Sequence, residues 1–526
     1  MTEKPDEDPG QGFMSAWALF SLSERSGASD FAKQLVQAGI LLLATDGTAE
    51  YLRSRGISVQ SVAEQYGSPE LLGGRVKTLH PELHAGILAR PGDLAELRAR
   101  GTEPIDYVIV SLYPFVETWA QHPPAEDLIE QIDIGGVAMI RAAAKNHERV
   151  TVIVDPSDYG WISERLRDEG TLSQRERHQL AAKAFRLTAS YDALIARWLT
   201  PPLPEPQAKW PEYFPVSLEL GFELRYGDNP HQRAAFYINP MHTPSWTLVS
   251  GETKPLSYNN LLDIEAASSC IRQVSGIACV IVKHASPCAM ALARDPIEAY
   301  QMAYEADPVS AFGGIIALNR PVDANLLASI FERQFVEILI APSFTPEGLV
   351  FLHKRPKVRA VQLHDTDRGT LPTEILRSAA GGYVIEETDQ ILLDEARVQC
   401  VTRRQPTDGE WADLRLAWHV ARSVPSNAIV LVRQGRTVGI GGGQPNRPDS
   451  LLIAKEKASR AGFPLESAVL ASDGFLPFPD VVETAGALGI SAIIQPGGSL
   501  KDRDAIVAAD TRNMAMLLTG LRHFRH

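Results

Sequence analysis

The sequence is poor in cysteine, in long apolar runs and in excess positive charge, and each shortage excludes a class of protein. Its four cysteines form no C-x-x-C pair, which excludes a cysteine-rich zinc site and suits a reducing compartment. No apolar run approaches the roughly 18 residues that a membrane helix needs. The formal net charge of −13 argues against a nucleic-acid partner, because such a partner requires many lysines and arginines. The sequence also begins without a basic and apolar leader, so we expect a cytoplasmic protein with no membrane partner.

The sequence is long enough for more than one hydrophobic core. Its 526 residues and hydrophobic fraction of 44% therefore predict two domains. Residues 1–15 are acidic and rich in Pro and Gly, which predicts a disordered tail. Residues 16–200 alternate apolar runs with amphipathic segments, as is typical of an α/β domain with a parallel sheet. A proline cluster predicts a linker over residues 201–217. Residues 218–526 again mix strands and helices, show no fixed-period repeat by inspection, and suffice for two subdomains.

The first informative motif is GGRVKTLHP, which brings Arg75, Lys77 and Thr78 together between glycines and a proline. Two cations and a hydroxyl in one loop can hold a phosphate or polarise a carbonyl group. Taken alone, such a segment is more often a solvated basic turn.

Three further clusters favour a site. Tyr113 follows an apolar run in IVSLYPF, Asp133 lies in QIDIGG, and Lys145 lies in RAAAKNH. The carboxyl ends of parallel strands line the ligand crevice of an α/β sheet, so we expect Tyr113 and Lys145 to converge on one pocket. Considered singly, Tyr113 would more often be a packed aromatic residue, and Asp133 a helix cap.

The GRVKTLHP, LYPF, IDIGG and AAAKNH segments resemble the inosine monophosphate cyclohydrolase domain of bifunctional purine biosynthesis proteins, over about residues 17–200. The resemblance implies a methylglyoxal synthase-like fold with Lys77, Tyr113, Asp133 and Lys145 as catalytic residues. The nucleotide-binding residues that it implies are Ser21, Ser23, Arg25, Thr45, Gly47, Thr48, Arg75 and Thr78. Ring closure joins a weakly nucleophilic carboxamide nitrogen to a formyl carbon, which a cation near the oxyanion and a carboxylate near the nitrogen assist.

Two positions depart from this family. Its phosphate loop usually reads S-G-G-T or T-G-G-T, whereas this chain has Asp46 between Thr45 and Gly47. A carboxylate at a helix N-terminus would repel a phosphate or compete with it for amides. Ser111 stands where the family usually has Asn. A cyclohydrolase weakened by Asp46 is therefore an alternative to the bifunctional enzyme.

The main motif of the second domain is CVIVKHASPCAM, in which an apolar run ends at Lys283 and His284. A histidine can accept a proton near neutral pH, and an adjacent lysine can donate one or hold an anion. A lone histidine after a strand is more often structural. Here it accompanies LRYGDNPHQ, LSYNNLLD, DPVSAFGG, VPSNAIV, VGIGGGQPNR, SDGFLPFPD and GLRHFRH.

These segments resemble, over about residues 218–526, the aminoimidazole carboxamide ribonucleotide transformylase domain of the same bifunctional family, which consists of two cytidine deaminase-like subdomains. The resemblance implies that Lys283 and His284 are the catalytic pair. The nucleotide contacts that it implies are Arg225, Tyr226, His231, Asn260, Gly313, Glu337, Asn427 and Arg522. Its folate region corresponds to Phe475, Phe478 and Asp480. It further implies 10-formyltetrahydrofolate as co-substrate, no required metal, and a homodimer with the transformylase site across the interface.

Other interpretations of this domain are weaker. GIGGGQ lacks the third glycine of a dinucleotide-binding fingerprint, because Gln444 stands there. HASPCAM lacks the second cysteine of a zinc deaminase, because Ala291 stands there. Pro425 and Pro445 depart from the family and restrict the backbone near Asn427. They motivate a last alternative, a non-catalytic paralogue that binds the nucleotide.

Overall fold

A computed structural model of the chain describes residues 16–200, 210–241, 245–251, 255–272, 274–364 and 374–526. The tail predicted over residues 1–15 lies outside the described residues, and so does the 201–209 part of the predicted linker. The chain divides into two compact units, residues 1–219 with 239–241, and residues 220–238 with 242–526. Both units are of the α/β type, as predicted.

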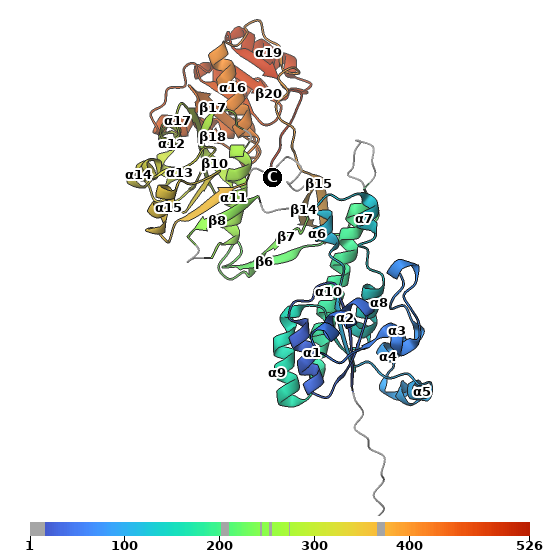
Figure 1. Cartoon of the computed structure of the whole chain (residues 1–526). Coiled ribbons are helices and arrows are strands. Elements are labelled where there is room, and N and C mark those ends of the chain that lie inside the picture. The colour runs from blue at the N-terminus through green and yellow to red at the C-terminus, as the bar shows by residue number, and fades with distance from the viewer. Residues whose placement is uncertain (1–15, 201–209, 242–244, 252–254, 273, 365–373) are drawn as a thin grey trace, which may run out of the picture. The chain divides into compact units, whose positions relative to one another are not determined.

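The first unit is built on a five-stranded sheet with the order β3-β2-β1-β4-β5. Helices such as α1, α8 and α9 lie around this sheet (Figure 1). All of its pairings are parallel, which confirms the predicted sheet. Phe20, in the middle of the sheet, is in register with Ala44 on one side and Ile109 on the other. The strands are β1 (Trp17–Leu22), β2 (Leu41–Ala44), β3 (Gln60–Ser61), β4 (Tyr107–Ser111) and β5 (Thr151–Ile153).

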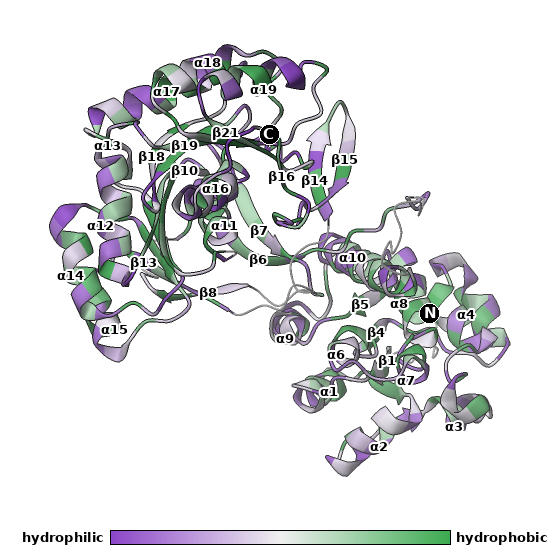
Figure 2. Cartoon of the chain, turned by 90° about the horizontal axis from the view of Figure 1, so that it is seen from above, coloured by the Kyte–Doolittle hydropathy of each residue, from purple (hydrophilic) through white to green (hydrophobic). Residues whose placement is uncertain are grey.

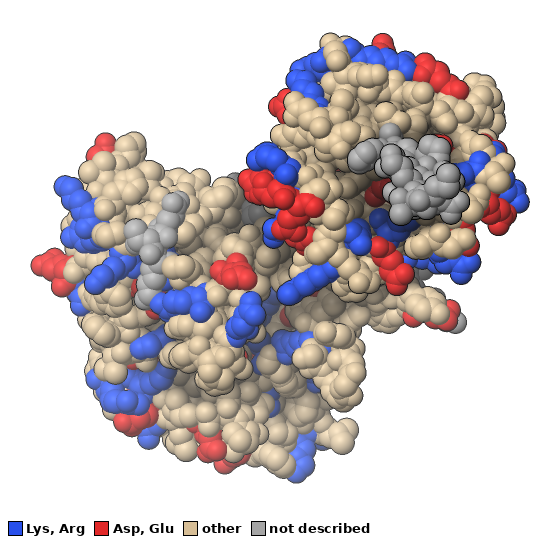
Figure 3. Space-filling model, turned by 90° about the horizontal axis from the view of Figure 1, so that it is seen from below, with Lys and Arg blue, Asp and Glu red and all other residues tan. Residues whose placement is uncertain are grey.

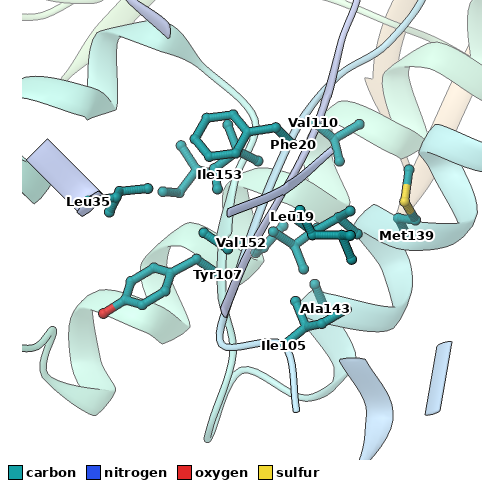
Figure 4. Packing of buried hydrophobic residues seen from close by; sticks show 14 of the residues in the cluster. Leu19, Phe20, Leu35, Ile105, Tyr107, Val110, Met139, Ala143, Val152 and Ile153 are labelled. Atoms are coloured by element: carbon teal, nitrogen blue, oxygen red, sulfur yellow. The ribbon is translucent and has the colours of Figure 1, made fainter. Parts of the chain in front are cut away.

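Helices cover both faces of this sheet. Phe20 of β1 faces Phe31 of α1, with the ring centroids 6.4 Å apart. Leu19, next along the strand, lies near Met139 and Ala143 of α8 (Figure 4). Burial of these side chains stabilises the unit by about 25 cal/mol for each Å² of apolar surface removed from water. The helices are α1 (Ala28–Gln37), α2 (Asp46–Ser54), α3 (Val62–Tyr66), α4 (Pro81–Leu88), α5 (Leu94–Ala99), α6 (Phe115–Trp119), α7 (Ala125–Ile129), α8 (Gly135–Lys145), α9 (Tyr159–Glu169) and α10 (Gln174–Leu199).

The second unit contains a mixed sheet of twelve strands, in the order β16-β21-β20-β19-β17-β18-β10-β9-β11-β12-β13-β8. Two small two-stranded sheets, β6-β7 and β14-β15, accompany it. The strands of the large sheet are β8 (Trp246–Ser250), β9 (Ile277–Lys283), β10 (Ser286–Ala293), β11 (Ile315–Leu318), β12 (Ile338–Ala341), β13 (Arg359–Leu363), β16 (Gln399–Cys400), β17 (Ile429–Arg433), β18 (Arg436–Gly441), β19 (Val469–Ser472), β20 (Ala492–Gln495) and β21 (Ala515–Leu518). The small sheets consist of β6 (Glu219–Leu224), β7 (Ala234–Ile238), β14 (Glu374–Ala379) and β15 (Gly382–Glu387).

This large sheet is an internal repeat. Each half has a hairpin, three parallel strands and an antiparallel edge strand, and the halves meet where β10 pairs with β18. Val280 and Val282 of the first hairpin correspond to Val430 and Val432 of the second, and all four belong to one buried cluster. No repeat is evident by inspection of the sequence, because the halves share a spacing of buried positions rather than a run of identical residues.

Three layers make up this unit (Figure 2). Helices α11 and α16 cover one face of the sheet with a continuous core, and the remaining long helices cover the other face of each half. Gly439 and Gly441 of the GIGGGQ segment lie in β18, where a Cβ would overlap the carbonyl oxygens of Ala454 and Ser450 in α17. These glycines therefore allow a helix to pack closely on the strand. The helices are α11 (Tyr258–Arg272), α12 (Pro296–Ala306), α13 (Pro308–Ala311), α14 (Ala324–Arg333), α15 (Pro346–His353), α16 (Asp408–Ala421), α17 (Arg447–Arg460), α18 (Asp480–Ala487) and α19 (Asp502–Thr511).

None of the helices in the described part of the chain is both long enough and apolar enough to span a bilayer. On the face shown in Figure 3, basic and acidic side chains are interspersed.

Candidate active sites

A pocket of about 630 Å³ lies at the carboxyl edge of the parallel sheet in the first unit. Its lining comes from the segments that follow β1, β2 and β4, from the segment between α3 and α4, and from the segment between α7 and α8. The strand order reverses between β1 and β4, and ligands of open α/β sheets bind at such a reversal. Eleven of the twelve residues expected to serve ring closure line it: Ser21, Ser23, Arg25, Thr45, Gly47, Thr48, Arg75, Lys77, Thr78, Tyr113 and Asp133.

The loop after β1 is held by Ser111, at the end of β4. The Ser111 hydroxyl oxygen accepts hydrogen bonds from the backbone amides of Ser23 and Glu24, both at 2.9 Å. The Thr48 hydroxyl oxygen accepts one from the amide of Leu22 at 3.1 Å. Ser111 therefore fixes this loop, although it stands where the family usually has Asn.

Helix α2 begins at this edge, and its N-cap Thr45 makes no side-chain cap. Amides at such a terminus, together with the helix dipole, suit a phosphate. Asp46 is not among the residues that line the pocket. Its charge acts on Arg53, whose pKa is raised chiefly by the hydrogen bond to Glu64 and further by Asp46.

The basic residues of GGRVKTLHP are paired with carboxylates that the sequence did not single out. Arg75 forms an ion pair with Glu130, with 3.1 Å between Nε and Oε2. The Lys77 ammonium lies 3.7 Å from Oε2 of Glu70. Both carboxylates also line the pocket, so each cation lies beside a carboxylate at the pocket wall.

Asp133 is fixed by several neighbours. Its Oδ1 accepts the amide of Gly136 at 2.7 Å, and its own amide donates to the Tyr191 hydroxyl at 2.9 Å. Burial raises the pKa of Asp133, while the amides of Gly136 and Tyr113 and the charge of Lys77 oppose that rise. Asp133, Tyr113 and Lys77 therefore meet in one place.

Close packing surrounds this carboxylate. A Cβ at Gly136 would overlap the Asp133 carboxylate, and a Cβ at Gly135 would overlap Oγ1 of Thr78. The two glycines of IDIGG thus give the helix terminus room to approach both side chains.

Lys145 does not line this pocket, so this chain alone does not bring it together with Tyr113 as expected. Lys145 ends α8, a helix of 11 residues whose first residue lines the pocket. A helix between two parallel strands runs back along the sheet, so its last residue lies about 15 Å from its first, toward the opposite edge.

Lys145 instead lines a second pocket of about 800 Å³. Apolar side chains such as Phe185 contribute much of its lining, together with Arg141, His147 and His178. Nδ1 of His178 lies 3.2 Å from Nε2 of His147, and the Arg141 guanidinium lies over the Phe185 ring.

In the second unit, Lys283 and His284 lie where β9 turns into β10. The Lys283 ammonium donates to the carbonyl oxygen of Phe312 at 3.0 Å, next to Gly313. Gly313 has a φ of +72°, a backbone conformation that favours glycine. His284 is exposed. Antiparallel pairing of β10 with β18 places this turn at the sheet edge where β18 ends and β17 begins.

Arg225 and Tyr226 interact with each other and lie near the ion pair of a buried arginine. The Arg225 guanidinium donates to the Tyr226 hydroxyl at 2.6 Å. Arg359, fully buried, lies 3.2 Å from Oε1 of Glu337. Burial lowers the pKa of Arg359 and the Glu337 charge opposes this, with smaller effects from Arg225 and Tyr226. Arg359 was not found from the sequence, where nothing but its place at the start of a strand marks it.

Two of the expected amide contacts already have protein partners. Asn260 is buried, and its Oδ1 accepts the amide of Ser257 at the start of α11. The Asn427 side chain donates to the carbonyl oxygen of Gln444 at 2.9 Å. Pro425 and Pro445 flank this region, where the Pro425 carbonyl oxygen accepts the amide of Gly443 at 2.7 Å.

The remaining expected residues lie at the surface of the second unit. His231 is exposed in the turn before β7, and the Arg522 guanidinium lies 4.3 Å from the Phe524 ring centroid. Of the folate candidates, Phe475 and Phe478 are partly exposed, Lys501 lies 4.7 Å from the Phe478 ring centroid, and Asp480 begins α18. Among the described residues, no group of three or more His, Cys, Asp or Glu side chains is arranged to hold a metal ion.

Comparisons with known proteins show which proteins this chain resembles. The chain matches the family model "AICARFT/IMPCHase bienzyme" over residues 143–457 and the "MGS-like domain" over residues 27–138. It is 45% identical over 519 residues to the bifunctional purine biosynthesis protein PurH of Bacillus thuringiensis (strain Al Hakam), covering 98% of this chain and 100% of that protein. PurH of Bacillus anthracis matches equally well. A crystal structure of ForH matches with 36% identity and a TM-score of 0.32, over 35% of this chain and 100% of that one.

Proposed function

The chain belongs to the bifunctional purine biosynthesis proteins, the PurH family, and from this premise we propose how its residues carry out the two reactions. The chain transfers a formyl group to aminoimidazole carboxamide ribonucleotide and closes the second ring to give inosine monophosphate. We assign ring closure to residues 16–200 and formyl transfer to residues 218–526, with residues 201–217 as the linker between them.

The pocket of the first unit is the cyclohydrolase site in this proposal. The observation that carries it is the gathering of eleven expected residues from separate loops around one cavity. The phosphate lies against the loop of Ser21, Ser23 and Arg25 and against the start of α2. The ring end then reaches Lys77, Tyr113 and Asp133.

Ring closure follows from these positions. The carboxamide nitrogen attacks the formyl carbon, and Asp133 accepts the proton that the nitrogen loses. The Lys77 ammonium stabilises the oxygen that becomes negative, and the Tyr113 hydroxyl protonates it. The resulting hydroxyl leaves as water with the proton held by Asp133, while the former formamide nitrogen gives its own proton to the Tyr113 oxygen. Burial favours Asp133 for this role, because a raised pKa makes a carboxylate a stronger base.

Formyl transfer uses the turn between β9 and β10. The amine of the nucleotide attacks the formyl carbon of 10-formyltetrahydrofolate while His284 accepts the proton of the amine. Lys283 stabilises the oxyanion and protonates the departing folate nitrogen. Asn260, Asn427 and Glu337 hold the nucleotide with Arg225, Tyr226, His231, Gly313 and Arg522, and the folate lies at Phe475, Phe478 and Asp480. In this proposal the reaction needs no metal. The protein is a homodimer and acts in the cytoplasm.

Two variants test the assignment of the two reactions to separate sites. Lys77→Ala should abolish ring closure and leave formyl transfer, so that the formylated nucleotide accumulates. His284→Ala should abolish formyl transfer and leave closure of added formylated nucleotide. Both are measured by following inosine monophosphate and the intermediate by chromatography. Loss of both activities in either variant would contradict separate sites, and a wild-type chain that binds nucleotide without reacting would support the non-catalytic alternative.

A further inference from the structure

The turn that carries His284 is strained. Lys283 pairs with Ser286 across the hairpin, so the turn consists of His284 and Ala285 alone. Their φ angles are +54° and +56°. Two-residue hairpins with positive φ at both positions usually contain Asn-Gly or Asp-Gly, because a Cβ disfavours this region. A histidine and an alanine here are unusual, and such strain persists only where surrounding contacts hold it.

The internal repeat supplies a comparison within the same chain. The second hairpin, between β17 and β18, also turns with two residues, Gln434 and Gly435, at φ angles of +51° and +76°. Asp413 of α16 accepts hydrogen bonds from both of their amides at 2.8 Å. Here a glycine takes the second position, so that position carries no Cβ penalty.

Asp263 of α11 is the counterpart of Asp413. Its Oδ1 accepts the amide of Ala285 at 2.5 Å, which ties the helix to the strained turn. Burial raises the pKa of Asp263, and the hydrogen bond from the Ala285 amide opposes that rise. The half that carries His284 thus has the aspartate but lacks the glycine. We therefore expect its turn to depend on Asp263 more than the second turn depends on Asp413.

We propose that Asp263 is a positioning residue for formyl transfer, which holds His284 in the left-handed turn by accepting the amide of Ala285. The inference rests on the proposed role of His284 as the base. Without this contact the turn relaxes, the imidazole moves off the line to the amine, and Lys283 moves with it. Because a displacement of about 1 Å at a reacting group costs on the order of 100-fold in rate, the effect appears in kcat.

Four variants test the inference, with kcat and KM for formyl transfer as readouts. Asp263→Ala should lower kcat about 10- to 100-fold and change KM for the nucleotide little. Asp263→Asn keeps an oxygen that can accept the amide and should retain most of kcat. Adding Ala285→Gly to Asp263→Ala should recover about tenfold in kcat, because glycine adopts the turn without help. Asp413→Ala is the matched control and should leave kcat within about twofold, since its turn carries no histidine.

Thermal unfolding and ring closure are measured on each variant, so that a folding defect is recognised. Equal kcat values for Asp263→Ala and Asp413→Ala would overturn the inference. So would a loss of kcat that Ala285→Gly does not relieve, because it would indicate that Asp263 acts on the substrate directly. His284→Ala separates the two proposals: if it keeps formyl transfer, the role of His284 fails, whereas an inactive His284→Ala beside a fully active Asp263→Ala defeats only the positioning role.

Discussion

Asp133 illustrates how a single carboxylate is held by backbone groups. Its oxygens accept amides from the start of α8 and from Tyr113, and this arrangement requires that the adjacent helix terminus carry no side chain. The position of the Asp133 carboxylate therefore depends on the absence of a Cβ at Gly136 as well as on its own hydrogen bonds.

Gly136→Ala is therefore expected to lower kcat for ring closure at least about tenfold, because the new Cβ displaces Asp133. Gly160→Ala is the matched control, since Gly160 is also the second residue of its helix and has no atom within 4 Å of an added Cβ. The control should keep full activity and gain up to about 1 kcal/mol in stability. Both variants are measured by steady-state kinetics with the formylated nucleotide and by thermal unfolding. Ring closure at the wild-type rate in Gly136→Ala would contradict the claim that a Cβ at this position displaces Asp133.

Replacement of Asp46 distinguishes the bifunctional enzyme from an enzyme with an impaired cyclohydrolase. Because Asp46 does not line the pocket and acts on Arg53, we expect Asp46→Gly to change the rate of ring closure by less than about twofold. The measurement is kcat/KM for the formylated nucleotide. A gain of tenfold or more would instead favour an enzyme that Asp46 impairs.

At the scale of elements, the start of α16 is fixed by a capping box. The Thr407 hydroxyl oxygen accepts the amide of Glu410, and the Glu410 carboxylate accepts the amide of Thr407. Arg404 donates to the same carboxylate at 2.6 Å. Burial alone would raise the pKa of Glu410, but the hydrogen bonds from Arg404, Ser491 and Thr407 outweigh it and lower the pKa to about 2.

This shift predicts a pH-dependent stability. A pKa below its ordinary value of 4.5 means that Glu410 stabilises the fold fully above pH 4.5 and progressively less as the pH falls toward 2. Glu410→Gln keeps the cap and loses the charge, so its deficit in thermal midpoint relative to the wild type should shrink between pH 6 and about pH 3. Thr407→Ala loses the cap, at a cost of about 1 kcal/mol, while the pH dependence remains. A deficit of Glu410→Gln that is constant with pH would contradict this assignment.

The direction of α8 has a consequence for the whole molecule. Because this helix carries Lys145 away from the pocket, Lys145 can serve ring closure, as the family resemblance implies, only in the pocket of a second copy. A homodimer with shared sites would meet this condition.

Mixed dimers test this arrangement. Lys77→Ala and Lys145→Ala should each lack ring closure, and co-expression of the two should restore about a quarter of the wild-type sites, because half the dimers are mixed and each mixed dimer has one intact site. Differently tagged chains allow the mixed dimer to be purified and assayed. No restoration would contradict a site shared between chains.

Much of this protein is readable from its sequence. Parallel strands follow from short apolar runs that alternate with amphipathic segments, and the cluster of loop residues follows from the rule that ligands bind at strand carboxyl ends. The resemblance of GRVKTLHP and CVIVKHASP to a known family supplied the two reactions. These features are local, because periodicity and motif spacing depend on residues that are near one another in the chain.

Only the tertiary structure decided which distant residues meet. It paired Arg75 with Glu130, buried Arg359 beside Glu337, left Asp46 out of the pocket lining and placed Lys145 in another pocket. It also revealed that the second unit is a repeat, in which Asp263 and Asp413 hold equivalent turns. The sequence specifies each residue and its neighbours along the chain. The direction of a helix across a sheet and the partner of a buried charge depend instead on how the whole chain packs.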